Sequence, residues 1–442
     1  MNRKIWKALG IAVCMLALAA PRAMAKTYEV GEDAPFIKFG DAVDKINKSG
    51  DEENEIILMQ NITLEGEHTL ERNTTIKGKE GEDHTISIKG EKTGITVTGE
   101  KTVLNLGANG YDGTLTIDGN IRDGSASENT RVAFITVSGG ATANMYGNVT
   151  LQNRKSTDNA CVVIMGSNSV FNMYGGVIEK CRAVIAASGA TFYMQSGKIK
   201  DCRFGGNRVI SVTDNSKFIM EGGIISGCEA DTGGGLYAEN STVTINKGTI
   251  SGCTAREGGG LYANNSAVTI KGGTISGCTA ENNGGGLYAI NSSTNSSTIN
   301  ITGGTISGCT AEKNGGGLYA NNSAINISDG TISGCTAKEK GGGLYADHST
   351  ITINNGTISG CTAKEKGGGL YATNQSTITI NNGTISECTA EMEEGGGLYA
   401  TNQSTITINN GTISECTAEM EEGGGLYATN QSTITINNGT IS

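Results

Sequence analysis

The sequence predicts an all-β protein, a parallel β-helix whose coils stack into a solenoid behind a short N-terminal capping helix. Residue types alternate strictly over 377–380, which places Ile378 and Ile380 on one face of a strand and Thr377 and Thr379 on the other. The alternation belongs to a longer phrase, Gly-Gly-Gly-Leu-Tyr-Ala, Thr/Ile, then Gly-Thr-Ile-Ser. That phrase recurs mostly every ~25 to 28 residues, the spacing of a solenoid coil, beginning at Gly233, Gly258, Gly284, Gly315, Gly341, Gly367, Gly395 and Gly423.

The chain opens with the features of an export signal. A positively charged start, from Arg3 to Lys7, precedes an apolar run over 8–20, and Ala23-Met24-Ala25 is a small-residue cleavage site. We therefore expect residues 1–25 to be a signal peptide. No later stretch approaches the roughly 20 apolar residues of a transmembrane helix.

The net charge of the chain argues against two classes of binding partner. The formal net charge is −11, whereas nucleic acids and acidic membrane surfaces select basic patches, so neither is an expected partner. The export signal, for its part, predicts that the mature chain is exported.

The mature chain divides into three stretches without a linker. Residues 26–54 form the N-terminal cap, in which apolar residues from Phe36 to Ile46 recur at helical spacing and Lys48-Ser49-Gly50 ends the pattern. Residues 55–232 are irregular coils, and 233–442 are the regular repeats. The first strands are expected at 55–59, 74–77, 85–89, 94–98, 102–106 and 114–117.

Each regular coil is expected to hold three strands: Leu-Tyr-Ala, Thr-Ile-Thr-Ile and Thr-Ile-Ser. Leu, Ala and Ile point inward, and Tyr and Thr point outward. Repeat length varies after Leu-Tyr-Ala, where 291–297 carries an insertion. It also varies after Cys-Thr-Ala, as at Arg256-Glu257. Because insertions collect in loops, both places are predicted to be turns.

The segment Ile250-Ser251-Gly252-Cys253, followed by Gly258-Gly259-Gly260-Leu261, matches a paired motif. It resembles the Phe-x-x-Asn and Gly-Gly-Ala-Ile motifs of chlamydial polymorphic outer-membrane proteins and related surface proteins. Ile250 takes the place of the Phe, and Cys253 that of the Asn. The resemblance covers 144–442 and implies a right-handed parallel β-helix of the pectin-lyase-like type, displayed on a bacterial surface as an adhesin or autotransporter passenger.

The resemblance implies a location at the cell surface, in the outer membrane or outside the cell, and a host-surface protein or glycan as partner. The sequence departs from the family's pattern in two ways: it shows neither a C-terminal β-barrel translocator nor a wall-sorting signal. The chain stops inside a repeat, and 367–394 and 395–422 are identical. We therefore expect a fragment of a longer reading frame, with its anchoring element missing.

A cysteine recurs at one position in successive coils. Buried free thiols and disulfides between adjacent rungs are both compatible with this ladder, whereas a linear stack offers no tetrahedral metal site. Asn153 is expected to hold the same place one coil earlier, Cys161 to be unpaired, and Cys14 in the signal to be a poor lipidation site. The ladder consists of Cys181, Cys202, Cys228, Cys253, Cys278, Cys309, Cys335, Cys361, Cys388 and Cys416.

An outward tyrosine also recurs in each coil. Its rings could stabilise the coils by stacking or could form a glycan-binding stripe. The set is Tyr237, Tyr262, Tyr288, Tyr319, Tyr345, Tyr371, Tyr399 and Tyr427. Outward Thr-x-Thr pairs resemble those of ice-binding proteins, but Ala267 and Asn300 are among the residues that interrupt the rows.

No catalytic residue, cofactor or metal site is predicted. The Gly triplets lack the context of a phosphate-binding loop. Acidic residues of the regular repeats lie mostly in turns, and the histidines at 68, 84 and 348 are scattered. The irregular part could hide a site among Arg154, Lys155, Asp158, Asp201, Arg203 and Arg208. The leading hypothesis is a non-enzymatic adhesin-like passenger or stalk; the alternatives are a polysaccharide lyase or hydrolase and a purely structural spacer.

Overall fold

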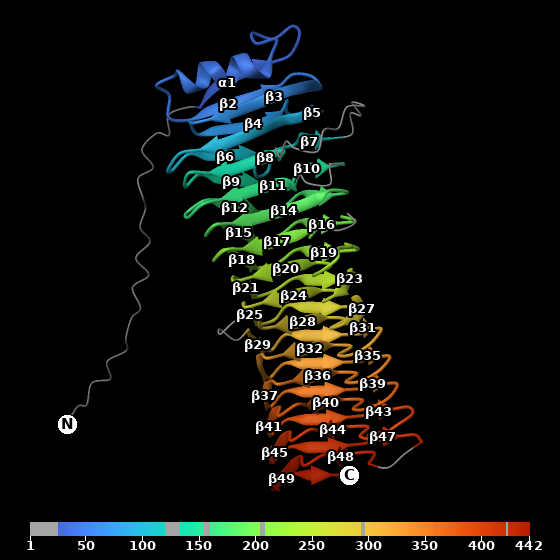
Figure 1. Ribbon diagram of the computed structural model, residues 1–442. Coiled ribbons are helices and arrows are strands. Elements are labelled where there is room, and N and C mark those ends of the chain that lie inside the picture. Colours follow the sequence, from blue (N-terminus) through green and yellow to red (C-terminus); the bar gives the residue numbers. More distant parts are fainter. Residues whose placement is uncertain (1–24, 120–132, 154–159, 204–207, 293–296, 421–422) are drawn as a thin grey trace, which may run out of the picture.

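The chain forms a right-handed β-solenoid of about 15 turns with one short helix near its N-terminal end (Figure 1). The computed structural model describes residues 25–119, 133–153, 160–203, 208–292, 297–420 and 423–442. The predicted signal peptide, with Cys14, lies outside the described residues apart from Ala25. The fold class predicted from the repeat is confirmed.

The capping helix α1 (Phe39–Asn47) lies over the first coil (Figure 1) and confirms the predicted cap. It buries Phe39, Ala42, Val43 and Ile46 and ends at Asn47, with Lys48, where the prediction placed the stop, as its C-terminal cap. Ile37 precedes the helix and is 69% exposed, so the apolar pattern, which began at Phe36, placed the start of the helix too early.

The first coils contain two strands that the sequence pattern did not reveal. They are β1 (Lys26–Val30), which pairs with β2 (Asn54–Leu58), and β3 (Ile62–Leu70). The segments 85–89 and 94–98 belong to a single strand, β5 (Asp83–Thr98), which pairs with β3 across a register shift. The remaining early strands agree with prediction to within about two residues: β4 (Thr74–Gly78), β6 (Val103–Leu106) and β7 (Thr114–Asp118).

Identical side chains lie level in successive regular coils, as Leu261 pairs with Leu287. One coil consists of β40 (Leu370–Thr373), β41 (Thr377–Asn381) and β42 (Thr384–Ser386). Its strands pair in register with those of the next coil, β44 (Leu398–Ala400), β45 (Thr405–Asn409) and β46 (Thr412–Ser414). All ladders between named strands are parallel. The inward Leu, Ala and Ile side chains of β40 to β42 are fully buried, which gives one continuous apolar core.

A fourth, short strand follows the cysteine in the regular coils and corrects the prediction of a plain turn there. Arg256 and Glu257 lie inside β23 rather than in a loop. The Thr-Ala backbones of neighbouring coils pair because the coils are already in register. The seven strands are β23 (Thr254–Glu257), β27 (Thr279–Asn283), β31 (Thr310–Ala311), β35 (Thr336–Ala337), β39 (Thr362–Ala363), β43 (Thr389–Ala390) and β47 (Thr417–Ala418).

Glycines occur in the regular coils for different structural reasons, as Gly341 and Gly342 of the triplet and Gly334 outside it show. Gly341 has φ of +68°, a left-handed conformation that glycine adopts without strain. A Cβ on Gly342 would overlap the carbonyl oxygen of Thr362. Gly334, at another corner, has φ of +58°, and a Cβ there would meet Gly308 N at an ordinary contact distance of 4.0 Å. Close backbone approach therefore requires glycine at 342, whereas at 334 the left-handed conformation favours glycine without requiring it, since Glu387 adopts the same conformation at the equivalent corner.

Replacing Gly342 with Ala should lower the free energy of unfolding by about 3 kcal/mol or more, because backbone must move to admit the methyl group. The matched control Gly334→Ala should cost about 1 kcal/mol, the strain of a left-handed alanine. Urea unfolding followed by circular dichroism measures both. Equal losses would contradict the close packing of the triplet.

Candidate functional site

The cysteine ladder is a buried part of the core. Cys202 to Cys388 are fully or almost fully buried and free, and Cys416 is partly exposed. The Cys361 thiol lies 3.3 Å from the carbonyl oxygen of Ser359 and 3.9 Å from that of Ile332 in the preceding coil. In the described part of the chain, no cluster of three or more His, Cys, Asp or Glu is arranged to hold a metal ion.

Two expectations for this corner are wrong. Cys161 is not unpaired: it forms a disulfide with Cys181, with their Cα atoms 6.5 Å apart. Cys161 lies in β11 (Ala160–Met165), and Cys181 directly precedes β14 (Arg182–Ala187). Because β11 pairs with β14 of the next coil, the two cysteines lie close enough to form the bond. Asn153 does not occupy the cysteine position. Gln152 pairs with Glu179, so Asn153 is level with Lys180, and both residues have positive φ.

The tyrosines form a continuous stack along the solenoid. Neighbouring ring centroids from Tyr237 to Tyr427 are 4.9 to 5.4 Å apart, and the rings are nearly parallel. Tyr237, Tyr371 and Tyr399 are less than 10% exposed, and the other five tyrosines of the stack are partly exposed. The Lys366 ammonium donates a hydrogen bond to the Tyr399 hydroxyl at 3.2 Å. Most ring faces therefore contact another ring, which leaves little aromatic surface for a ligand.

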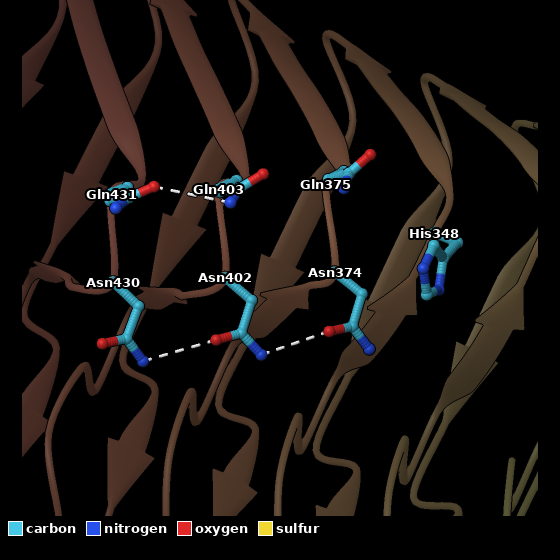
Figure 2. A pocket seen from close by; sticks show the side chains of 7 residues that line it. All are labelled: His348, Asn374, Gln375, Asn402, Gln403, Asn430 and Gln431. Atoms are coloured by element: carbon cyan, nitrogen blue, oxygen red, sulfur yellow. Dashed lines mark hydrogen bonds between the residues drawn. The ribbon is translucent and has the colours of Figure 1, made fainter.

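A polar groove lies at the corner between β40 and β41 and at the equivalent corners of the next two coils (Figure 2). Sequence reasoning missed it. Its volume is about 500 Å³, and it is lined by His348, Asn374, Gln375, Asn402, Gln403, Asn430 and Gln431. The available signal was a change in turn length: three coils read Thr-Asn-Gln-Ser, whereas the preceding coil reads Asp347-His348-Ser349.

The added residue explains the shape of the groove. In the shorter turn only His348 has positive φ, whereas Asn374 and Gln375 both do, at +53° and +61°. Two successive left-handed residues place an Asn row and a Gln row side by side along the axis (Figure 2). Asn is well suited to this conformation, but a left-handed Gln is uncommon.

The Asn row is held in place by hydrogen bonds between coils. The Asn402 side-chain amide donates to Asn374 Oδ1 at 3.1 Å and to Thr373 Oγ1 at 3.1 Å. Asn430 makes the equivalent bonds one coil further on. At the other end Asn374 donates to Asp347 Oδ1 at 2.8 Å, and that oxygen also lies 2.7 Å from His348 Nδ1.

A second hollow follows another corner, where Ser251 and Gly252 and their counterparts leave a shallow trough as far as Glu387. A Cβ on Gly252 would meet nothing within 4 Å. The trough therefore reflects small side chains at a corner, because it is lined by a row of serines and glycines that ends at Glu387.

The residues considered for catalysis are not assembled into one site in the described part of the chain. Arg203 lies 3.9 Å from Glu229, whereas the Arg208 guanidinium lies over the Tyr237 ring. Asp201 is exposed at a corner with positive φ. Arg154, Lys155 and Asp158 lie outside the described residues.

Each histidine has its own local contacts. The His68 ring packs edge-on against Phe39 under the cap, and His348 pairs with Asp347. His84 is buried, with its Nε2 3.6 Å from a Glu82 carboxylate oxygen. Among the described residues, no helix is both long and apolar enough to span a bilayer.

Comparison with known proteins supports the fold. A family model described as the right-handed β-helix region matches residues 298–442. No curated protein matches the chain. The solved structures that it resembles include catalytic domains of GH87 α-1,3-glucanases. One, in complex with tetrasaccharides, is 13% identical, with a TM-score of 0.37 and coverage of 94% of this chain and 70% of that one.

Another, in complex with nigerose, is 12% identical, with a TM-score of 0.36 and coverage of 92% and 69%. Similarity at this level carries no argument about activity.

Thiol titration should distinguish free cysteines from disulfides between rungs. In the mature chain, eight thiols should react with Ellman's reagent only after denaturation, because they are buried and free, whereas the partly exposed Cys416 should react in the native protein. Reduction should then release two more, from Cys161 and Cys181. Fewer than nine thiols before reduction would mean that rungs are cross-linked.

Titration of the tyrosines by ultraviolet absorbance should report the covered stack. Burial raises the pKa of Tyr319 and of Tyr371 to about 12. Unfolded tyrosines ionise near pH 10. Tyr319 and Tyr371 should therefore stay largely neutral at pH 11, and stability should fall as pH rises above about 10, because ionisation then favours the unfolded chain. Ionisation of all 13 tyrosines near pH 10 in the native protein would contradict this.

Proposed function

We propose that the protein is an exported bacterial β-helix that acts without catalysis as an adhesin-like passenger or stalk at the cell surface. The observation that carries the proposal is the register of the regular coils, in which each coil repeats the backbone path of the one before it. Such a stack can hold a contact surface away from its point of attachment and can repeat the same turn along one edge.

Three further features support the proposal. The N-terminal residues have the pattern of an export signal. The paired motif resembles that of chlamydial polymorphic outer-membrane proteins, which implies surface display. The groove contains neutral amides rather than the paired carboxylates by which glycosidases act. The partner we propose is a host-surface protein or glycan.

Surface exposure and attachment test the proposal in the source bacterium. Antibody against residues 233–442 should label intact cells, and deletion of the gene should reduce attachment to host cells or to immobilised glycans. Restoring the gene should restore attachment. Restoring it without 367–394 should give a stable protein, because 395–422 is identical and continues the stack.

Two results would count against this function. Unchanged attachment after deletion, with labelled protein on the wild-type surface, would favour a structural spacer. Release of reducing ends or unsaturated sugars from polysaccharides by the purified chain would favour an enzyme.

A further inference from the structure

We propose that the amide groove binds a short stretch of a neutral, extended polysaccharide lying parallel to the solenoid axis. We define the amide groove as the Asn row of Asn374, Asn402 and Asn430, the Gln row of Gln375, Gln403 and Gln431, and His348 at one end. The proposal rests on the proposed function and specifies its ligand. It is carried by the hydrogen-bonding capacity, charge and dimensions of this groove.

The Gln row has hydrogen-bonding capacity to spare. Its residues are exposed, and its one bond between coils runs from Gln403 Nε2 to Gln431 Oε1 at 3.4 Å. Within the described residues the Gln375 side chain makes no hydrogen bond, as Figure 2 shows for the residues drawn. The Asn row is already bonded to its neighbours. The groove thus combines a rigid row with a row of amides that can donate and accept.

The charge of the lining favours a neutral ligand. The ionisable members at the groove are His348 and its partner Asp347, both at one end. No Lys or Arg lines the groove, although acidic polymers are commonly bound through such cations. Hydroxyl groups match amides well, because each can donate one hydrogen bond and accept others.

Size and spacing favour a chain of sugar rings over a folded partner. Equivalent amides repeat once per coil, so three coils span roughly 10 to 15 Å at ~4.8 Å per coil. A volume of about 500 Å³ is within the range of small-ligand sites. A stable protein partner would need about 800 Å² on each side. An extended polysaccharide can instead present hydroxyls ring by ring along the row.

Calorimetric titration of the folded mature chain tests the proposal with defined probes. We would use glucose hexasaccharides with β-1,4, β-1,3 and α-1,4 linkages, their shorter homologues, and a galacturonate hexasaccharide. At least one neutral hexasaccharide should bind saturably and more tightly than its disaccharide. The acidic hexasaccharide should bind more weakly than the neutral ligand.

The decisive variant is Gln375→Gly, Gln403→Gly and Gln431→Gly together. Glycine keeps the left-handed backbone but removes the amides. Affinity should fall about tenfold or more, because several hydrogen bonds are lost. The matched control replaces Asn382, Asn410 and Asn438 with Gly. These are exposed amides with positive φ in the same three coils but at the next corner, and their loss should leave affinity unchanged.

Three results would overturn the proposal: no saturable binding by any neutral probe, equal effects of the two triple variants, or tighter binding of the acidic hexasaccharide. Light scattering tests the competing occupant of the groove, a second copy of the chain, by measuring self-association. Self-association that the Gln variant abolishes would assign the groove to a second copy of the chain. These outcomes are separate from the proposed function, because surface labelling and cell attachment do not depend on which ligand the groove takes.

Discussion

Hydrogen bonding between the backbones of successive coils is the constraint on which the rest of the structure depends. It continues through the corners as well as the strands: Leu344 N donates to Gly369 O at 2.9 Å, and Thr362 N donates to Cys335 O at 2.9 Å. Because each coil copies the path of its neighbour, any residue that repeats in sequence lies next to its own copy. Stacks of Ile, Cys, Tyr and Asn side chains all follow from that register.

The corners are where identical coils acquire different surfaces. The cysteine corner contains positive-φ residues as different as Lys180, Gly252 and Glu387, so its backbone conformation does not require one residue type. At the corner after Leu-Tyr-Ala, one added residue turns a single left-handed position into two. The core strands remain in register across this change, as Tyr345 pairs with Tyr371. Surface chemistry can therefore vary at a corner while the core stays the same.

Burial separates the stacks that support the coil from the one that faces solvent. The cysteines are enclosed by the core, and the tyrosine rings largely cover one another. The Gln row differs because its residues are exposed and, in the described part of the chain, the only hydrogen bond between its side chains joins Gln403 to Gln431. In the surface stalk that we propose, such a row would present a repeated polar contact along one edge.

The sequence by itself determined the solenoid, its inward Leu and Ile residues and its cap, because these follow from local periodicity. Tertiary structure alone decided the fourth strand at Thr389–Ala390, the Cys161–Cys181 disulfide and the level of Asn153. Each depends on which residues of neighbouring coils lie opposite one another. For the disulfide and Asn153, the irregular early coils do not show that register in the sequence; for Thr389–Ala390, two residues are too few to show a strand pattern. The amide groove also required the structure, because only the left-handed backbone at Asn374 and Gln375 shows that the added residue separates two rows.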